Sequence, residues 1–210
     1  MSLRTTIAGF GEVLVTLGIV VGLYVVWFLW IDAVGVHHRE ADVVRRLTRE
    51  FAVPGSPAAP LRRGQAIAIA RIPRFGAHWA LPVYEGVDRR ILDRGGLAHY
   101  PGTPMPGEVG NVGIAGHRAG HGNPLIDIDK LRRGDDILIE TSAGVEEYRV
   151  SSHRIVRPTD VGVLDPVPPG ATRTTSGRWL TLTSCSPRYG STNRYVVLAR
   201  FAGRAAPGAG

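Results

Sequence analysis

The chain of 210 residues has little sulfur and little lysine, with one cysteine, Cys185, two methionines and one lysine, Lys130. A single cysteine excludes an intramolecular disulfide and a cysteine-based zinc site. The net charge of +7 would attract polyanions, but it equally describes a solvated basic surface. Aromatic residues make up 7% of the chain, and no basic run is interleaved with them. We therefore expect no nucleic-acid partner.

Charge is absent from residues 13–31, which follow a short tail of residues 1–12. At about 1.5 Å per residue this segment spans about 28 Å, close to the hydrocarbon core of a bilayer. It predicts a transmembrane helix that serves as an uncleaved signal anchor, and thus a single-pass protein of the cell membrane. Most nearby basic residues follow the segment, so the positive-inside rule alone would place the following domain in the cytoplasm.

The remaining chain divides into four segments. Residues 32–51 have apolar positions at near-helical spacing and predict a juxtamembrane amphipathic helix, and residues 52–63 form a Pro/Ala linker. Residues 64–202 are predicted to form the catalytic domain, followed by a flexible tail at 203–210. Short β-type runs separated by turn residues indicate an all-β domain, an antiparallel sheet closed into a barrel or sandwich. Short helices are expected at 89–92 and 124–131.

Cys185 ends the apolar run 179–184, and Arg194 begins the next run nine residues later. If the two runs form a hairpin, the thiol and the guanidinium lie at the same end of the sheet. A nearby cation favours the nucleophilic thiolate and can stabilise an oxyanion in acyl transfer. The alternative is a small buried core cysteine without reactivity.

A cysteine nucleophile also needs a proton shuttle, for which histidine is the usual residue. His117 directly follows the apolar run 111–116, where a strand would deliver it to a sheet end, although a polar surface histidine fits the same position. His117 and His121 have the spacing of a helical zinc pair. The segment between them lacks the expected glutamate and contains glycine, so we predict no metal site.

Three motifs together resemble a known family. "TLTSC", with Pro187 and with Arg194 in "RYVVLAR", resembles the catalytic signature of sortases, the cysteine transpeptidases of Gram-positive cell surfaces. "HYPGTPMPGEVGNVGIAGHR" at 99–118 resembles the segment that carries the sortase histidine, and its sequence is most similar to that of actinobacterial class E enzymes. "PLIDIDKLRRGDDILIET" is similar to the segment that follows. The resemblance covers about residues 64–201.

The resemblance implies an eight-stranded β-barrel tethered outside the membrane by the amino-terminal helix, against the charge count. It implies that Cys185 attacks the threonine carbonyl of an LPxTG-type sorting signal, with LAxTG preferred in class E. Arg194 would stabilise the oxyanion and His117 would protonate the departing glycine amine. The implied partners are surface proteins with a carboxyl-terminal sorting signal and an amine from a cell-wall precursor or a pilin lysine. No metal or organic cofactor is needed.

Substrate contacts are expected from Tyr100, Thr183 and Ser184. Tyr100 can pack and hydrogen-bond near the second position of the signal, but a buried structural tyrosine fits as well. Thr183 can line the site or simply be a strand residue facing it. Ser184 and Ser186 flank the cysteine where the family often has threonine and a larger polar residue, and Pro104 interrupts a "YPGTA"-like phrase. These departures affect pocket shape more than chemistry.

Two alternatives to a sortase remain. An L,D-transpeptidase that crosslinks peptidoglycan also pairs cysteine with histidine in a β-rich domain, but its S-x-G-C sequence is absent. A sortase-like barrel could also serve as a membrane-anchored scaffold without turnover.

Overall fold

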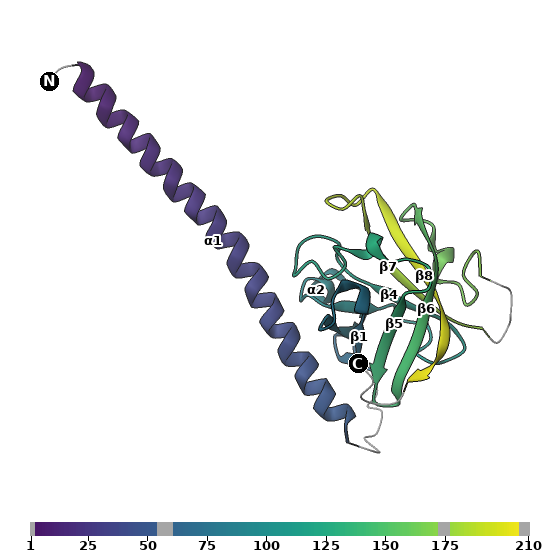
Figure 1. Cartoon of the computed structure of the whole chain (residues 1–210). Helices are drawn as coiled ribbons and strands as arrows, with labels where there is room; N and C mark the ends of the chain where they lie inside the picture. The colour runs from purple at the N-terminus through teal and green to yellow at the C-terminus, as the bar shows by residue number, and fades with distance from the viewer. Residues whose placement is uncertain (1–2, 54–60, 172–176, 206–210) are drawn as a thin grey trace. The chain divides into compact units, whose positions relative to one another are not determined.

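The structure is a computed structural model, and it describes residues 3–53, 61–171 and 177–205 (Figure 1). Within these ranges, the side chains of residues 3–9, 26 and 28–34 also lie outside the description. Residues 54–60 of the predicted linker and 206–210 of the predicted tail are likewise outside it. The chain divides into two compact units, Met1–Gly35 and Val36–Gly210.

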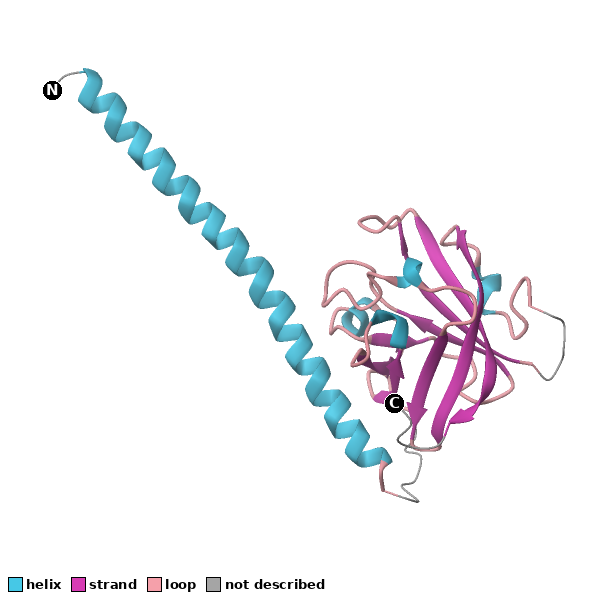
Figure 2. Cartoon of the chain, in the orientation of Figure 1, coloured by secondary structure: helices cyan, strands magenta, loops and turns pink. Residues whose placement is uncertain are grey.

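The amino-terminal helix α1 runs over Leu3–Phe51 (Figure 2). It is continuous across residues 31 and 32, where the sequence predicted the boundary between two helical segments. Proline and glycine at 54 and 55 follow soon after its last residue, and both disfavour the continuation of a helix.

The prediction of a transmembrane helix at 13–31 requires a correction. A bilayer span takes about 20 consecutive, mostly apolar helical residues. Across the described part of the chain, which omits the side chains at 26 and 28–34, no helix is both long and apolar enough to cross a membrane. This finding contradicts the predicted membrane anchor and the predicted cell-membrane localisation with an extracellular catalytic domain.

Eight strands close into a β-barrel in the second unit (Figures 1 and 2), which confirms the barrel predicted for this domain. The strands are β1 (Ala66–Arg71), β2 (Ala80–Glu85), β3 (Leu97–His99), β4 (Gly110–Ala115), β5 (Asp136–Thr141), β6 (Gly144–Val156), β7 (Arg178–Ser186) and β8 (Asn193–Ala205). Their order around the barrel is β1-β2-β3-β4-β7-β8-β6-β5. Closure leaves no unpaired sheet edge.

Two neighbouring pairs are parallel, β2 with β3 and β4 with β7, whereas the sequence predicted an antiparallel sheet. Parallel neighbours need a crossover connection. The short helix α2 (Arg89–Leu92) lies in the first crossover, and β5 and β6 intervene in the second. The helix expected at 124–131 is reduced to a single 3₁₀ turn, η2 (Ile128–Lys130).

Alternate residues of the strands fill the barrel. On β7 and β8 the aliphatic side chains of the barrel core are Leu180, Leu182, Val197 and Ala199. Burial of one such large aliphatic side chain contributes about 1.5–3 kcal/mol. Because side chains alternate along a strand, Thr181, Thr183 and Cys185 point to the outer side of β7. There the 3₁₀ turn η3 (Val161–Leu164) covers part of the sheet, with Val163 packed on Val196 and Leu198 of β8.

The last part of α1 packs on the barrel within the second unit. Val36 and Leu47 are buried, and Val43 packs against the cluster that contains Tyr84 and Ile91. Glu40 lies on the same helical face, because residues 36, 40, 43 and 47 follow the three- and four-residue spacing of one face. Its carboxylate accepts a hydrogen bond of 2.7 Å from the Gly96 amide. Burial raises the pKa of Glu40, although bonds from Gly96 and His37 oppose that change.

Candidate active site

Cys185 and Arg194 lie opposite each other on neighbouring antiparallel strands. In the β7–β8 ladder, Cys185 is the register partner of Arg194, near the end of β7 and the beginning of β8. The loop between the strands brings them there, as the hairpin expectation required. Both residues fall on the outer side of the sheet, because the barrel-facing positions on either side of them are Ser184, Ser186 and Tyr195. Cys185 is a free cysteine of intermediate exposure.

His117 lies at the same end of the barrel, just beyond β4. Ala115, the last residue of β4, is the register partner of Thr183 in the parallel β4–β7 pair. The Gly116 amide then donates to the Thr183 carbonyl oxygen at 3.1 Å, so the chain still runs beside β7 there. Continued two residues beyond this last pair, the same register would bring His117 beside Cys185. The three predicted catalytic residues therefore lie at the ends of three adjacent strands.

The Arg194 guanidinium is fixed by the loop before its own strand. Nη1 donates to the carbonyl oxygens of Ser191 and Asn193 at 3.0 and 3.1 Å. These two bonds use two of the five guanidinium N–H groups. The guanidinium is thus held in place, and its remaining N–H groups can donate to another acceptor.

His117 contacts an aspartate that the sequence reasoning did not consider. Its Nε2 lies 2.9 Å from Oδ1 of Asp93, the residue that caps the carboxyl end of α2. The ring of His121 stacks on the ring of His117, with centroids 4.8 Å apart. His121 Nε2 is 3.4 Å from the same Asp93 oxygen, and its Nδ1 donates to the Asp93 carbonyl oxygen at 3.2 Å. His117 is thus held between an acidic and a second imidazole side chain.

A second arginine, Arg118, contacts the end of β7. Arg118 is 5% exposed, and its Nη1 lies 3.5 Å from the Cys185 carbonyl oxygen. Its Nη2 pairs with Asp129 at 3.0 Å, and its guanidinium sits over the Tyr195 ring. Burial alone would raise the pKa of the Asp129 carboxyl. A backbone hydrogen bond, the bond from Arg188 and the two arginine charges outweigh burial and lower the pKa below its usual value.

A shallow groove of about 430 Å³ lies at Cys185 and His117, and Arg194 is not among the residues that line it. It is lined by His117, Arg118, Ala119, Gly120, Cys185, Arg188, Tyr189, Gly190 and Ser191. The cysteine and the histidine therefore face a common cavity. Tyr189 is 84% exposed on the β7–β8 loop, so its ring is available to a peptide that enters the groove.

The three predicted substrate-contact residues lie beside the groove but not among the residues that line it. The Tyr100 hydroxyl is hydrogen-bonded to the Thr183 hydroxyl at 3.1 Å, on the outer side of β7. Ser184 points into the barrel, is 3% exposed and donates its hydroxyl to the Gly116 carbonyl oxygen at 2.8 Å. The structure therefore joins Tyr100 and Thr183 as a pair and uses the Ser184 hydroxyl internally.

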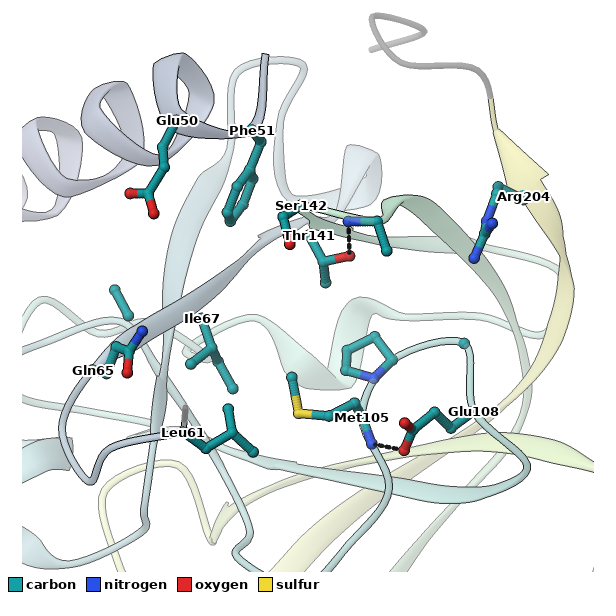
Figure 3. Close-up of a pocket in the computed structure, with 14 residues that line it drawn as sticks. Glu50, Phe51, Leu61, Gln65, Ile67, Met105, Glu108, Thr141, Ser142 and Arg204 are labelled. Atoms are coloured by element: carbon teal, nitrogen blue, oxygen red, sulfur yellow. Dashed lines mark hydrogen bonds between the residues drawn. The ribbon is translucent and has the colours of Figure 1, made fainter. Parts of the chain in front are cut away.

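A second pocket, of about 370 Å³, lies at the other end of the barrel, where β8 ends (Figure 3). Apolar side chains from several segments line it, including Phe51, Leu61, Ile67 and Met105. The polar groups at its rim include Glu108, which accepts a bond from the Met105 amide at 2.9 Å, and Arg204. No thiol or histidine lines this second pocket, whereas Cys185 and His117 both line the groove.

Comparisons with known proteins identify the family of the chain. The sequence model of the sortase domain matches residues 70–202 of the chain. Sortase E1 of Streptomyces coelicolor is 34% identical over 198 residues, which are 91% of this chain and 56% of that protein. The solved structure of sortase E from Streptomyces avermitilis is 37% identical with a TM-score of 0.64, over 71% of this chain and 95% of that chain. Sortase E1 from Streptomyces coelicolor, solved with a tripeptide in its active site, has 35% identity and a TM-score of 0.64, over 70% and 94% of the two chains.

A closed eight-stranded barrel with cysteine, histidine and arginine at three adjacent strand ends defines a β-barrel protein with a cysteine-based site. The chain belongs to the sortase family. The predicted resemblance to class E sortases is confirmed, and so is the predicted enzyme class, cysteine transpeptidase, at the level of the family. The chain spans 56% of the length of sortase E1, so its own substrates and partners remain to be proposed.

Sequence reasoning did not find Asp93, Arg118 and His121 as neighbours of the site. Asp93 precedes His117 by 24 residues in a different crossover, and no spacing rule connects the two. Arg118 directly follows the histidine in "GHR", but a sequence does not show that its side chain turns back under Cys185. His121 carried a signal, its four-residue spacing from His117, but the missing glutamate and the intervening glycine argued against a helical metal pair.

Proposed function

We propose that this chain is a transpeptidase that cleaves a sorting signal of the LAxTG or LPxTG type between threonine and glycine and transfers the protein to an amine. The observation that supports this most is the alignment of His117, Cys185 and Arg194 at the ends of β4, β7 and β8. A thiol nucleophile, a proton donor and a fixed cation are the groups that acyl transfer requires.

The first half of the reaction forms a thioester. The Cys185 thiolate attacks the threonine carbonyl carbon, and the electron pair of the carbonyl moves to its oxygen. When the tetrahedral intermediate collapses, the bond between threonine and glycine breaks and protonated His117 gives its proton to the departing amine. In the second half, a new amine attacks the thioester and returns a proton to His117, and the Cys185 thiolate leaves.

Arg194 is proposed to stabilise the negative oxygen in both halves. Its two bonds to the carbonyl oxygens of Ser191 and Asn193 hold the guanidinium before substrate arrives. A donor that is already oriented stabilises developing charge without the cost of reorganisation. Arg118, the other arginine near Cys185, is occupied with Asp129 and the Tyr195 ring, which favours Arg194 for this role.

The proposed substrate class follows from the resemblance to class E sortases, for which LAxTG is expected. One relative, sortase E1 of Streptomyces coelicolor, has a tripeptide in its active site. The groove of about 430 Å³ at Cys185 suits an extended peptide of similar size. Tyr100 and Thr183, bonded to each other, are proposed to form the wall next to it. The proposed acceptor is an amine of a cell-wall precursor or a pilin lysine.

The test uses the full chain with LAxTG and LPxTG peptides and triglycine as the amine, and products are identified by liquid chromatography and mass spectrometry. We expect cleavage after threonine, a threonine–triglycine product and faster turnover of LAxTG. Cys185→Ala, verified as folded by its unchanged thermal unfolding, should give no product. A folded wild-type chain that gives no product with either peptide would overturn the proposal in favour of a scaffold. Crosslinking of muropeptides instead would favour an L,D-transpeptidase.

A further inference from the structure

The loop after β4 places two histidines and an aspartate around one point. The "HRAGH" segment is a turn rather than a helix, because Gly120 and His121 adopt φ values of 83° and 50°. The turn folds the His121 ring back onto the His117 ring. Asp93 reaches the same point from the end of α2. One possible ligand atom from each of the three side chains lies within 4.8 Å of the other two.

The hydrogen-bond pattern of His121 orients a lone pair toward that point. Its Nδ1 lies 3.2 Å from the Asp93 carbonyl oxygen, which can only accept, so Nδ1 carries the proton. In the neutral ring, Nε2 is then an acceptor, and it faces the Asp93 carboxylate oxygen at 3.4 Å. Two acceptors this close repel each other unless the ring is protonated or a metal cation lies between them. A backbone carbonyl bound to the other ring nitrogen is also the usual support for a metal-bound histidine.

One of the two separations at Asp93 equals the ligand spacing of a tetrahedral zinc site, and the other, a hydrogen bond, would lengthen when the ion replaces the proton. Zn²⁺ binds histidine nitrogen and carboxylate oxygen at about 2.0–2.2 Å, which puts neighbouring ligand atoms about 3.4 Å apart in a tetrahedron. The observed separations from Asp93 Oδ1 are 2.9 Å to His117 Nε2 and 3.4 Å to His121 Nε2. The three side chains are 25–40% exposed, so an ion can reach them from solvent. The only other charge paired with Asp93 among the described residues is the exposed Arg89, at 3.6 Å.

We infer that Asp93, His117 and His121 bind Zn²⁺, and that the bound ion inhibits the enzyme. The three side chains supply two nitrogens and one oxygen and leave the fourth position to water. The inhibition rests on the proposed function, because an ion on His117 Nε2 removes the base and acid that the transfer needs. Binding itself depends only on the geometry. The site thus makes the histidine available either to a proton or to the metal.

Binding is tested with ZnCl₂ and the full chain at pH 7.5, by competition with a chelating dye of known zinc affinity. We expect one Zn²⁺ per chain. His121→Asn and Asp93→Asn should each weaken binding at least about tenfold. The matched control is His78→Asn, an exposed histidine outside the cluster, which should leave the affinity within about twofold of wild type.

Two further outcomes would overturn the inference. One is an absence of binding up to millimolar Zn²⁺, or binding that His121→Asn and His78→Asn affect equally. The other is complete loss of binding in Cys185→Ala, which would assign the ion to the thiol. Thermal unfolding of each variant excludes misfolding, and the histidine Nε2 chemical shifts of the wild-type chain should move on addition of Zn²⁺.

The failure of this inference and that of the proposed function can be told apart. If the chain binds Zn²⁺ but transfers no peptide, the zinc site is supported and the proposed activity is contradicted. If the chain transfers the peptide but binds no Zn²⁺, and Zn²⁺ does not inhibit the transfer, only the zinc site is contradicted. If both hold, Zn²⁺ should inhibit transfer and a chelator should restore it.

Discussion

Arg194 differs from the two other arginines near Cys185 in the groups that it contacts. Arg118 and Arg188 line the groove, and Arg194 is the register partner of Cys185 on the neighbouring strand. Arg118 and Arg188 both pair with Asp129, which ties them to the fold. Arg194 bonds only to carbonyl oxygens of the adjoining loop among the contacts described, so its full charge is available to a substrate oxygen.

Replacement of Arg194 by alanine should therefore affect catalysis far more than stability. We expect kcat for peptide transfer to fall about 100- to 1000-fold, the usual cost of losing a donor to an oxyanion. The free energy of unfolding should change by less than about 1 kcal/mol, since the side chain is partly exposed. Steady-state kinetics and chemical denaturation measure the two quantities on the same samples.

The matched control for this prediction is Arg200→Ala, an exposed arginine six residues further along the same strand and on the same side. It should leave kcat near the wild-type value. A loss of folding in Arg194→Ala, with normal kcat in the molecules that remain folded, would return Arg194 to a structural role.

At the scale of secondary-structure elements, the crossover between β2 and β3 contacts both α1 and His117. Gly96 in this crossover has a φ of 78°, and a Cβ there would lie 2.7 Å from the Pro82 carbonyl oxygen, so glycine is required. Its amide is bound by Glu40 of α1, while Asp93, three residues earlier, contacts His117. A change in how α1 packs can thus reach the site through one short segment.

The buried Glu40 predicts a pH dependence for this packing. Burial raises the pKa of Glu40 above 4.5, so the folded chain holds the proton more tightly than the unfolded chain does. The resulting contribution to stability is fully present below pH 4.5 and is lost as pH rises through the raised pKa. His37 and the Gly96 amide face the same carboxyl and limit the effect. The thermal unfolding temperature of wild type minus that of Glu40→Gln should therefore decrease as pH rises from 4.5.

Glu50→Gln, an exposed glutamate on the same helix, is the control and should keep the wild-type pH profile. A difference between wild type and Glu40→Gln that stays constant from pH 4 to 8 would show that Glu40 does not hold the proton in this way.

Local sequence patterns predicted which residues form strands better than they predicted which strands lie next to each other. The runs at 179–184 and 194–201 correspond to β7 and β8, and their loop length places Cys185 against Arg194. The parallel pairs were missed because strand alternation looks the same in parallel and antiparallel sheets. The strands β2 and β3 were both missed, and the three residues of β3 are too few to give a periodicity.

At the scale of the whole molecule, the barrel decides which side chains can act together. His117 and Cys185 are 68 positions apart in the sequence, yet the parallel β4–β7 pair sets them side by side. The sequence identified both residue types at strand ends, but only the strand order makes them neighbours. The Asp93 contact depends on the same closure, since β3 and β4 bring the first crossover beside the histidine loop.

The predicted membrane anchor shows the opposite case, in which composition was the whole basis of the prediction. A run without charge at 13–31 matched the thickness of a bilayer. Among the residues that the structure describes, no helix meets the length and apolarity needed to cross a membrane. The barrel prediction rested in addition on strand patterns and on motifs in a fixed order, and these agree with the fold.

The most direct test of the central claim is the intact mass of the whole chain during its reaction with an LAxTG peptide in the absence of an added amine. Cys185 as nucleophile predicts a mass increase equal to the acyl fragment that ends in threonine, removed by hydroxylamine or triglycine and absent in Cys185→Ala. Peptide mapping should place the added mass on Cys185. Cleavage of the peptide without any covalent adduct, or an adduct that persists in Cys185→Ala, would contradict the claim.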